Sequence, residues 1–121
     1  MDAADLDQIA EQLFANFVAW DLDAVAQMLA PDAVITQNGR SAPGPEALAT
    51  IGSLRSVVGD HHYEDVRRTT GDHTVVEEHR VVSVTPAGVP LDLPACVVIR
   101  VNADGLIAAI DEYVDTAPLL R

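Results

Sequence analysis

The residues that could do chemistry begin with a glutamate near the end of the chain. Residues 105–115 form an extended apolar run, Gly-Leu-Ile-Ala-Ala-Ile-Asp-Glu-Tyr-Val-Asp. If this run is a strand, its side chains alternate between two faces, and Glu112 is the single charge in its row. The other members of that row are Leu106, Ala108, Ile110 and Val114. A carboxylate that loses water there can take and give protons near neutral pH, so Glu112 is a candidate general base or acid. The alternative is that the apolar cover ends at Ile110 and Glu112 lies at a wet rim.

A histidine in the middle of the chain could assist this glutamate. In a strand, His79 shares a face with Glu77 and Val81, and its imidazole could serve as acid, as base or as bridge to Glu112. A half-buried strand histidine bonded to a neighbouring carboxylate would give the same pattern. The sequence leaves both interpretations open.

The other histidines and the cysteine give no second chemical site. His61 and His62 would point to opposite faces of a strand, and His73 adds no pair at ligand spacing, so we expect no metal. The single Cys96 cannot form an internal disulfide. In an apolar strand, such a cysteine favours packing over nucleophilic chemistry.

Composition narrows the classes of function further. The formal net charge is −12 at pH 7, which repels phosphate and anionic lipid, so nucleic acids and membranes are poor candidate partners. All seven basic residues are arginine. Without lysine, Schiff-base enzymes, covalent pyridoxal-phosphate enzymes and P-loops are excluded. We expect Arg67 and Arg68 to offset the acidity on an exposed strand.

The length and the apolar content predict one domain spanning residues 1–121. Hydrophobic residues make up 49% of the 121 positions, enough for a single core. No apolar run reaches the roughly 18 residues of a membrane span, and the N-terminus lacks the basic region of a secretion signal. A lone cysteine agrees with a reducing compartment, so we expect a cytoplasmic protein.

Hydrophobic spacing indicates helices first and strands afterwards. Three-to-four spacing of apolar residues predicts three helices, at residues 6–20, 22–29 and 45–58. Strand-like runs bounded by turn residues follow at 33–38, 61–70, 73–85, 91–101 and 105–115. This order predicts an α+β domain in which the helices pack on a curved, mostly antiparallel sheet.

Both faces of the predicted sheet carry apolar residues. In residues 91–101 one face is apolar throughout, while Cys96 and Val98 interrupt the polar face. Because the helices can cover only one face, we expect a second copy of the chain to cover the other, giving a homodimer.

Three features together resemble a known superfamily. They are the order of elements, the run Trp-Asp-Leu-Asp-Ala-Val at 20–25, and the ending Ile-Asp-Glu-Tyr-Val-Asp at 110–115. Over nearly its whole length the chain resembles the SnoaL-like, nuclear-transport-factor-2-like superfamily. The resemblance implies a cone of three helices on a curved sheet around a cavity. This fold hosts cyclases, isomerases, hydrolases and non-catalytic proteins, so the fold alone does not give the function.

Within that superfamily the chain is most similar to the limonene-epoxide-hydrolase-like group. The group's final strand carries Trp-Arg-Asp-Tyr-Phe-Asp, whose first Asp activates water, and the resemblance places Glu112 there. Its first strand ends in Tyr-x-Asn, both holding the water; here Thr36 and Asn38 occupy those places. Its middle strand carries Arg-x-Asp, whose Asp protonates the epoxide; here His79 and Val81 stand at these positions.

The departures from that pattern bear on the reaction. Val81 cannot donate a proton, so either His79 has taken that role or the chemistry differs. Ketosteroid isomerases of this fold place a tyrosine from the first helix in an oxyanion hole. This chain offers Phe14, Phe17 and Trp20 there, which disfavours that design.

We therefore predict an enzyme without cofactor or metal that binds a small apolar or polycyclic molecule between helices and sheet. Glu112 is the predicted proton-transfer group, His79 its partner and Asn38 the orienting amide. Epoxide opening by water and intramolecular ring closure both fit, and the Asn38 and Glu112 matches favour the first. The alternatives are a non-catalytic ligand-binding module, favoured by Val81, and a ketosteroid-isomerase-like isomerase. The predicted substrate-binding residues are Thr36, Leu54, Val58, Val81, Leu93, Ala95, Val97 and Val114.

Overall fold

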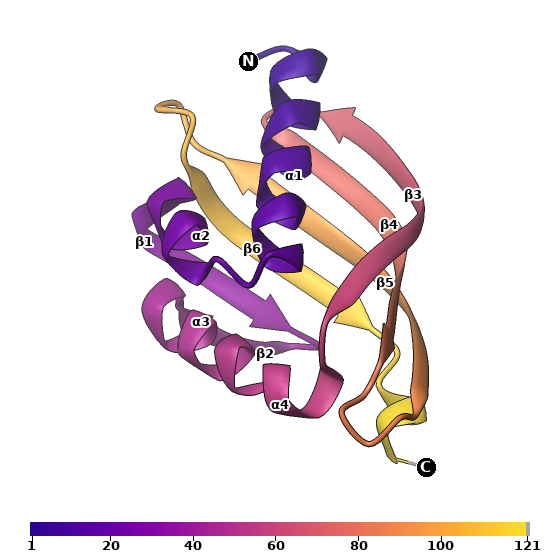
Figure 1. The fold of residues 1–121 in the computed structure, drawn as a ribbon. Coiled ribbons are helices and arrows are strands. Elements are labelled where there is room, and N and C mark those ends of the chain that lie inside the picture. The colour runs from indigo at the N-terminus through magenta and orange to yellow at the C-terminus, as the bar shows by residue number, and fades with distance from the viewer. Residues whose placement is uncertain (121) are drawn as a thin grey trace.

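A computed structural model describes residues 1–120, and within them the fold is a curved sheet with helices on one side (Figure 1). The helices are α1 (Ala3–Val18), α2 (Leu22–Met28), α3 (Gly44–Ser53) and α4 (Arg55–Val58), and a 3₁₀ turn, η1, covers Ala117–Leu120. The strands are β1 (Leu29–Gln37), β2 (Arg40–Pro43), β3 (His61–Gly71), β4 (Thr74–Val84), β5 (Pro90–Val101) and β6 (Ile107–Val114). The predicted α+β class is confirmed, with the third helix divided at Leu54 into α3 and α4.

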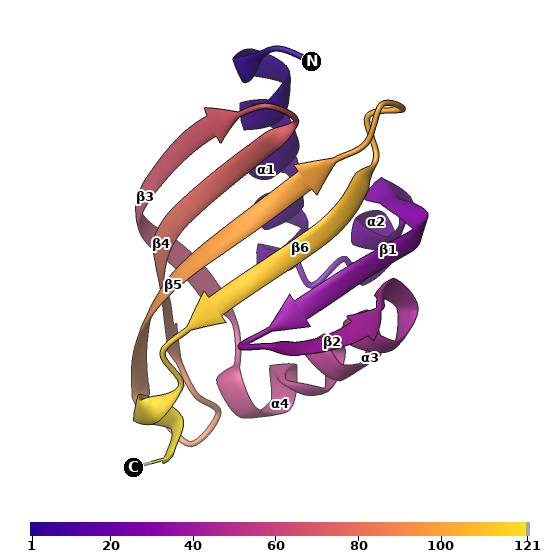
Figure 2. The same cartoon turned by 180° about the vertical axis from the view of Figure 1, so that it is seen from behind.

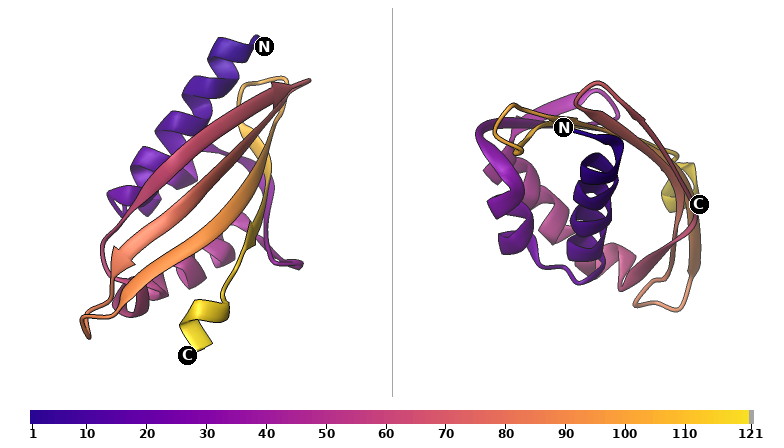
Figure 3. Two further views of the ribbon diagram at one scale, coloured as in Figure 1. Left: turned by 90° about the vertical axis from the view of Figure 1, so that its right-hand side faces the viewer. Right: turned by 90° about the horizontal axis from the view of Figure 1, so that it is seen from above.

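The sheet is mostly antiparallel and it curls. The strand order is β2-β1-β6-β5-β4-β3, and β1 with β6 is the parallel pair. Seen from above, the strands bend around α1, while the reverse view shows no helix over the outer face (Figures 2 and 3). The inner, concave face therefore holds the core and any internal site.

Helix α1 begins at a capping box and closes the concave side. The Asp2 carboxylate accepts from the backbone N–H of Asp5, and the Asp5 carboxylate accepts in return from the Asp2 N–H, which satisfies two free donors of the first turn. Four residues of the helix are buried against the sheet: Leu6, Ala10, Leu13 and Phe14.

A two-residue turn joins β1 to β2 and corrects one prediction. Residues 41–45 read Ser-Ala-Pro-Gly-Pro, a run that predicts a turn after a strand break at Gly39. The structure instead pairs Gln37 with Arg40 and returns the chain as β2. Asn38 and Gly39 have φ of +48° and +85°, the left-handed pair that tight hairpins need and that Asn-Gly supplies readily.

Two bulges change which side chains face inward. In β6, Arg100 pairs with Ala109 but Val101 pairs with Ile107. Ile107 is therefore buried in the core, and the prediction that Leu106 and Ala108 share a face with Ile110 and Glu112 is wrong. Beyond the bulge the alternation holds, so Ile110, Glu112 and Val114 line one cavity together.

The second bulge lies in β3 and re-aims an arginine. Glu64 pairs with Arg80 and Arg67 with Glu78, with one extra residue between them on β3. Asp65 in this bulge has φ +55°. The extra residue turns Arg68 inward, so the expectation that Arg67 and Arg68 are both exposed is wrong for Arg68, whose side chain is 20% exposed against 77% for Arg67.

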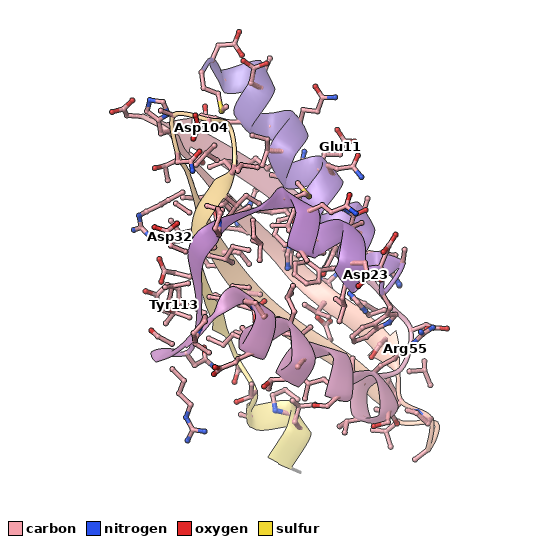
Figure 4. The ribbon with its side chains drawn as sticks, turned by 90° about the vertical axis from the view of Figure 1, so that its left-hand side faces the viewer. Glu11, Asp23, Asp32, Arg55, Asp104 and Tyr113 are labelled. Carbon is pink, nitrogen blue, oxygen red and sulfur yellow. The ribbon has the colours of Figure 1, made fainter. Side chains whose placement is uncertain are left out.

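The outer face mixes ion pairs with apolar side chains. Arg80 bonds Asp65 at 2.8 Å and Asp92 at 2.5 Å, and Arg100 pairs with Asp111. Tyr113 is 56% exposed on this face, and Figure 4 shows it projecting on the side away from the helices. Among residues 1–120, no helix is long and apolar enough to cross a membrane.

Candidate functional site

A cavity of about 320 Å³ lies between the helices and the concave face of the sheet. Six of the predicted wall residues line it: Leu54, Val58, Val81, Leu93, Val97 and Val114. Three aromatic residues from the C-terminal part of α1 and the turn after it also line the cavity: Phe14, Phe17 and Trp20. A mostly apolar wall with a few polar side chains is typical of a site for a small, largely apolar ligand.

Glu112 is the acidic side chain of this cavity. It is half-buried on β6, and parallel pairing sets it beside Gln37 of β1. The Gln37 amide nitrogen donates to Glu112 Oε1 at 3.0 Å. Since no described residue bonds Oε2, that oxygen remains for a ligand. A carboxylate held through one oxygen in an apolar wall has the geometry of a general base.

Asn38 lines the cavity, but its amide is already engaged. Its Nδ2 donates to the carbonyl of Val114 at 3.0 Å, and its Oδ1 accepts from the Val114 N–H at 2.9 Å. Both ends of the side chain thus fasten the β1–β2 turn to β6. Thr36 points to the opposite face, where its hydroxyl lies 2.8 Å from that of Ser41, and neither Thr36 nor Ala95 lines the cavity.

His79 faces inward with Glu77 and Val81 as the spacing predicted, but it lies behind the cavity wall. Its side chain is 1% exposed, and its Nδ1 lies 2.5 Å from Glu77 Oε2. The other Glu77 oxygen accepts from Arg68 Nε at 2.6 Å, and Arg68 also reaches Asp7 of α1 at 3.2 Å. These four residues, Asp7, Arg68, Glu77 and His79, form a continuous chain of charged and hydrogen-bonded groups that runs from the half-exposed Asp7 to the interior; it is called here the buried network.

An aromatic ring separates His79 from the ligand space. Tyr63 of β3 lines the cavity, and its ring stacks on His79 with centroids 4.2 Å apart and an interplanar angle of 27°. Phe14 meets the His79 ring edge-on at 5.0 Å. His79 is therefore not among the residues that line the cavity with Glu112, and the direct partnership of His79 with Glu112 stays a prediction.

The residues that face Glu112 across the cavity were not predicted from the sequence. His61 and Tyr63 stand at i and i+2 on β3, so they share its inner face, and His61 Nε2 lies 3.1 Å from the Tyr63 hydroxyl. Trp20 meets the His61 ring edge-on at 5.2 Å. His61, Tyr63 and Trp20 are called here the aromatic cluster. Strand alternation was the signal that could have placed His61 and Tyr63 on one face, whereas Trp20 lies in the turn after α1.

Burial fixes the protonation of the aromatic cluster. Desolvation, opposed by Asp60 and reinforced by the neighbouring His79 and His62, lowers the pKa of His61, so its ring is neutral at pH 7. Desolvation also raises the pKa of Tyr63 far above its usual range, and the negative charges of Glu112 and Glu77 add to that effect. Tyr63 is therefore a hydrogen-bond donor or acceptor and not a phenolate base.

Metal chemistry has no support in the described side chains. Within residues 1–120, no group of three or more histidine, cysteine, aspartate or glutamate side chains is placed to hold an ion. His61 is engaged with Tyr63, and His62 turns outward to Glu64 at 2.7 Å.

Comparison with known proteins gives a family and a fold. A family model described as SnoaL-like domain matches residues 10–110, whereas no curated protein matches the chain. The solved structure of AclR, a proposed hydroxylase from Streptomyces galilaeus, is similar with a TM-score of 0.86, 16% identity, and coverage of 98% of this chain and 80% of that chain. A proposed polyketide cyclase from Xanthomonas campestris pv. campestris is similar with a TM-score of 0.79, 22% identity, and coverage of 91% and 90%. At such identities these structures establish the fold.

Proposed function

This chain belongs to the SnoaL-like domain family, and we propose that it is a cofactor-independent enzyme that moves protons on a small, largely apolar molecule. The observation that carries the proposal is the half-buried Glu112 in the cavity wall, with one oxygen bonded to Gln37 and the other free. A carboxylate so placed can remove a proton from a bound molecule and return it at another atom.

Ring closure fits the site better than epoxide hydrolysis. Hydrolysis of the limonene-epoxide type needs a held water and an acid opposite the base. Thr36 lies on the outer face, both ends of the Asn38 amide are bonded to Val114, and Val81 has no proton to give. Ring closure within one molecule needs no held water, and one solved structure of similar fold is described as a proposed polyketide cyclase.

The test is a substrate panel with a mass readout. Wild-type protein is incubated without added cofactor with poly-keto compounds and epoxides that fit a cavity of about 320 Å³. Ring closure conserves the substrate mass or loses one water, whereas epoxide hydrolysis gains one water. We expect turnover of the poly-keto compounds. Saturable binding of these compounds with no product in either group would contradict the enzyme and favour the binding module.

A homodimer through the outer face of the sheet is part of the proposal. Val34 and Tyr113 are 40% and 56% exposed on this helix-free face, and Cys96 and Val98 lie half-buried near its centre. Two such faces packed together would remove these side chains from water. We expect sedimentation at micromolar concentration to give twice the 12.9 kDa mass of one chain; a monomer mass would contradict the dimer and leave the fold unaffected.

A further inference from the structure

We propose that Tyr63, oriented by His61, donates a hydrogen bond to a carbonyl oxygen of the molecule on which Glu112 acts. This inference rests on the proposed function and narrows its substrate to ketones or related compounds with an exposed oxygen acceptor. The assignment makes Tyr63 a second catalytic residue, on the opposite side of the cavity from Glu112.

The geometry of the sheet supports this assignment. Tyr63 lies on the edge strand β3 and Glu112 on β6, two strands separated by β4 and β5. Because the sheet curls (Figure 3), inner side chains of both strands line the same cavity. Burial raises the pKa of the Tyr63 hydroxyl most strongly, and the negative charges of Glu112 and Glu77 add to it, so the hydroxyl keeps its proton on the wall that it shares with Glu112.

Two unpaired nitrogen atoms decide which way the hydrogen bond between His61 and Tyr63 runs. Within the described residues, three side-chain nitrogens are buried without a partner, and two of them, Trp20 Nε1 and His61 Nδ1, belong to the aromatic cluster; the third is His79 Nε2. Trp20 Nε1 can only donate. A proton on His61 Nδ1 would add a second unpaired buried donor to the aromatic cluster, in the ring that Trp20 meets edge-on, which is costly. The neutral imidazole therefore carries its proton on Nε2 and donates to the Tyr63 oxygen.

This direction leaves the Tyr63 proton free for a ligand. A tyrosine hydroxyl has one hydrogen to give, and its oxygen accepts the bond from His61. An accepted hydrogen bond polarises the hydroxyl and strengthens the bond that it donates. The ring is held in place by His79 on one face and by Phe14, edge-on at 5.3 Å, so the donor is oriented before a ligand arrives.

The chemistry balances without any added reagent. Glu112 takes the proton from the carbon next to the carbonyl, and the electron pair of the broken C–H bond moves onto the oxygen that Tyr63 hydrogen-bonds. That carbon then forms a bond to a second carbonyl carbon of the same molecule. The oxygen of the second carbonyl takes the proton from Glu112, and the carboxylate is restored.

The experiment compares two ligands that differ in one oxygen. Binding of 1-tetralone and of tetralin is measured by NMR titration of the labelled protein. We expect wild type to bind 1-tetralone about threefold to tenfold more tightly than tetralin, the effect of one added neutral hydrogen bond. Tyr63→Phe should remove that preference and leave tetralin binding unchanged. In the complex with Tyr63→Phe, the carbonyl stretching band of bound 1-tetralone should also shift from its position in the wild-type complex toward its value in an apolar solvent.

Two control variants keep the outcome unambiguous. Tyr113→Phe makes the same chemical change on the exposed outer face and should keep the preference. Glu112→Gln should keep it as well, so a failure of Tyr63 can be told from a failure of Glu112 as base. The proposal is overturned if wild type binds 1-tetralone no more tightly than tetralin, or if Tyr63→Phe weakens both ligands equally.

Discussion

Replacing Glu112 by glutamine is expected to lower turnover of a poly-keto substrate by roughly two to four orders of magnitude while ligand binding survives. The amide keeps the size of the side chain and can still bond to Gln37, which contacts Oε1 at 3.0 Å in the native protein. It cannot accept a proton from carbon. The loss should therefore fall on the chemical step, measured as single-turnover rate at saturating substrate.

Asp111→Asn is the matched control for this substitution. Asp111 is the next residue along β6, it faces outward, and its carboxylate pairs with Arg100. The same change from acid to amide there should leave the rate within a factor of about two, because an exposed ion pair contributes little. Equal rates for wild type and Glu112→Gln would remove Glu112 from the mechanism, and loss of activity in both variants would point to a structural effect of altering β6.

The fold could be predicted because the spacing of apolar residues and the positions of turn residues are both clear in the sequence. The helical stripe that contains Leu6 and Leu13 and the alternation of residues 91–101 place the same side chains inside as the structure does. The short β2 was missed because it has four residues and contains Pro43, too little for a periodic signal. Asn38 and Gly39 were the available signal for that hairpin.

The site was predicted less well, and the bulges are one physical reason. One extra residue in a strand exchanges its inner and outer faces, which no periodicity count reveals in advance. In β3 the bulge falls between Tyr63 and Arg68, so an odd-numbered residue and an even-numbered one both face inward. In β6 the bulge precedes Ile110, so Glu112 kept its predicted face while Leu106 and Ala108 did not.

The family pattern predicted positions better than it predicted roles. Asn38, His79 and Glu112 all lie on or near the concave face, but both ends of the Asn38 amide are bonded to the backbone of Val114, and His79 Nδ1 is bonded to Glu77. What a side chain can do depends on which of its atoms remain unpaired. That information comes from partners distant in sequence, such as Arg68 and Asp7, and not from the residue type.

Breaking the buried network should cost much stability, because it leaves a buried charge uncompensated, and Glu77→Ala is expected to lower the free energy of unfolding by about 3 kcal/mol or more. Glu77 is 0% exposed and connects Arg68 to His79. Removing it leaves both partners in the interior without their acceptor, although Arg68 keeps Asp7. With total stabilities of about 5–15 kcal/mol for domains, urea unfolding should show a much lower midpoint or no folded baseline.

Glu78→Ala separates this effect from the loss of any strand glutamate. Glu78 is the neighbouring residue on β4, but it points outward, where its side chain is 51% exposed and lies 3.4 Å from Arg67. An exposed pair of that kind contributes about 0–1 kcal/mol, so the urea midpoint should move little. Glu77→Gln should lie between the two, because the amide oxygen can still accept from Arg68 while the charge is lost. Similar midpoints for Glu77→Ala and Glu78→Ala would contradict the network as a source of stability, and the support of His79 beneath the Tyr63 ring would then have to come from packing with Phe14 alone.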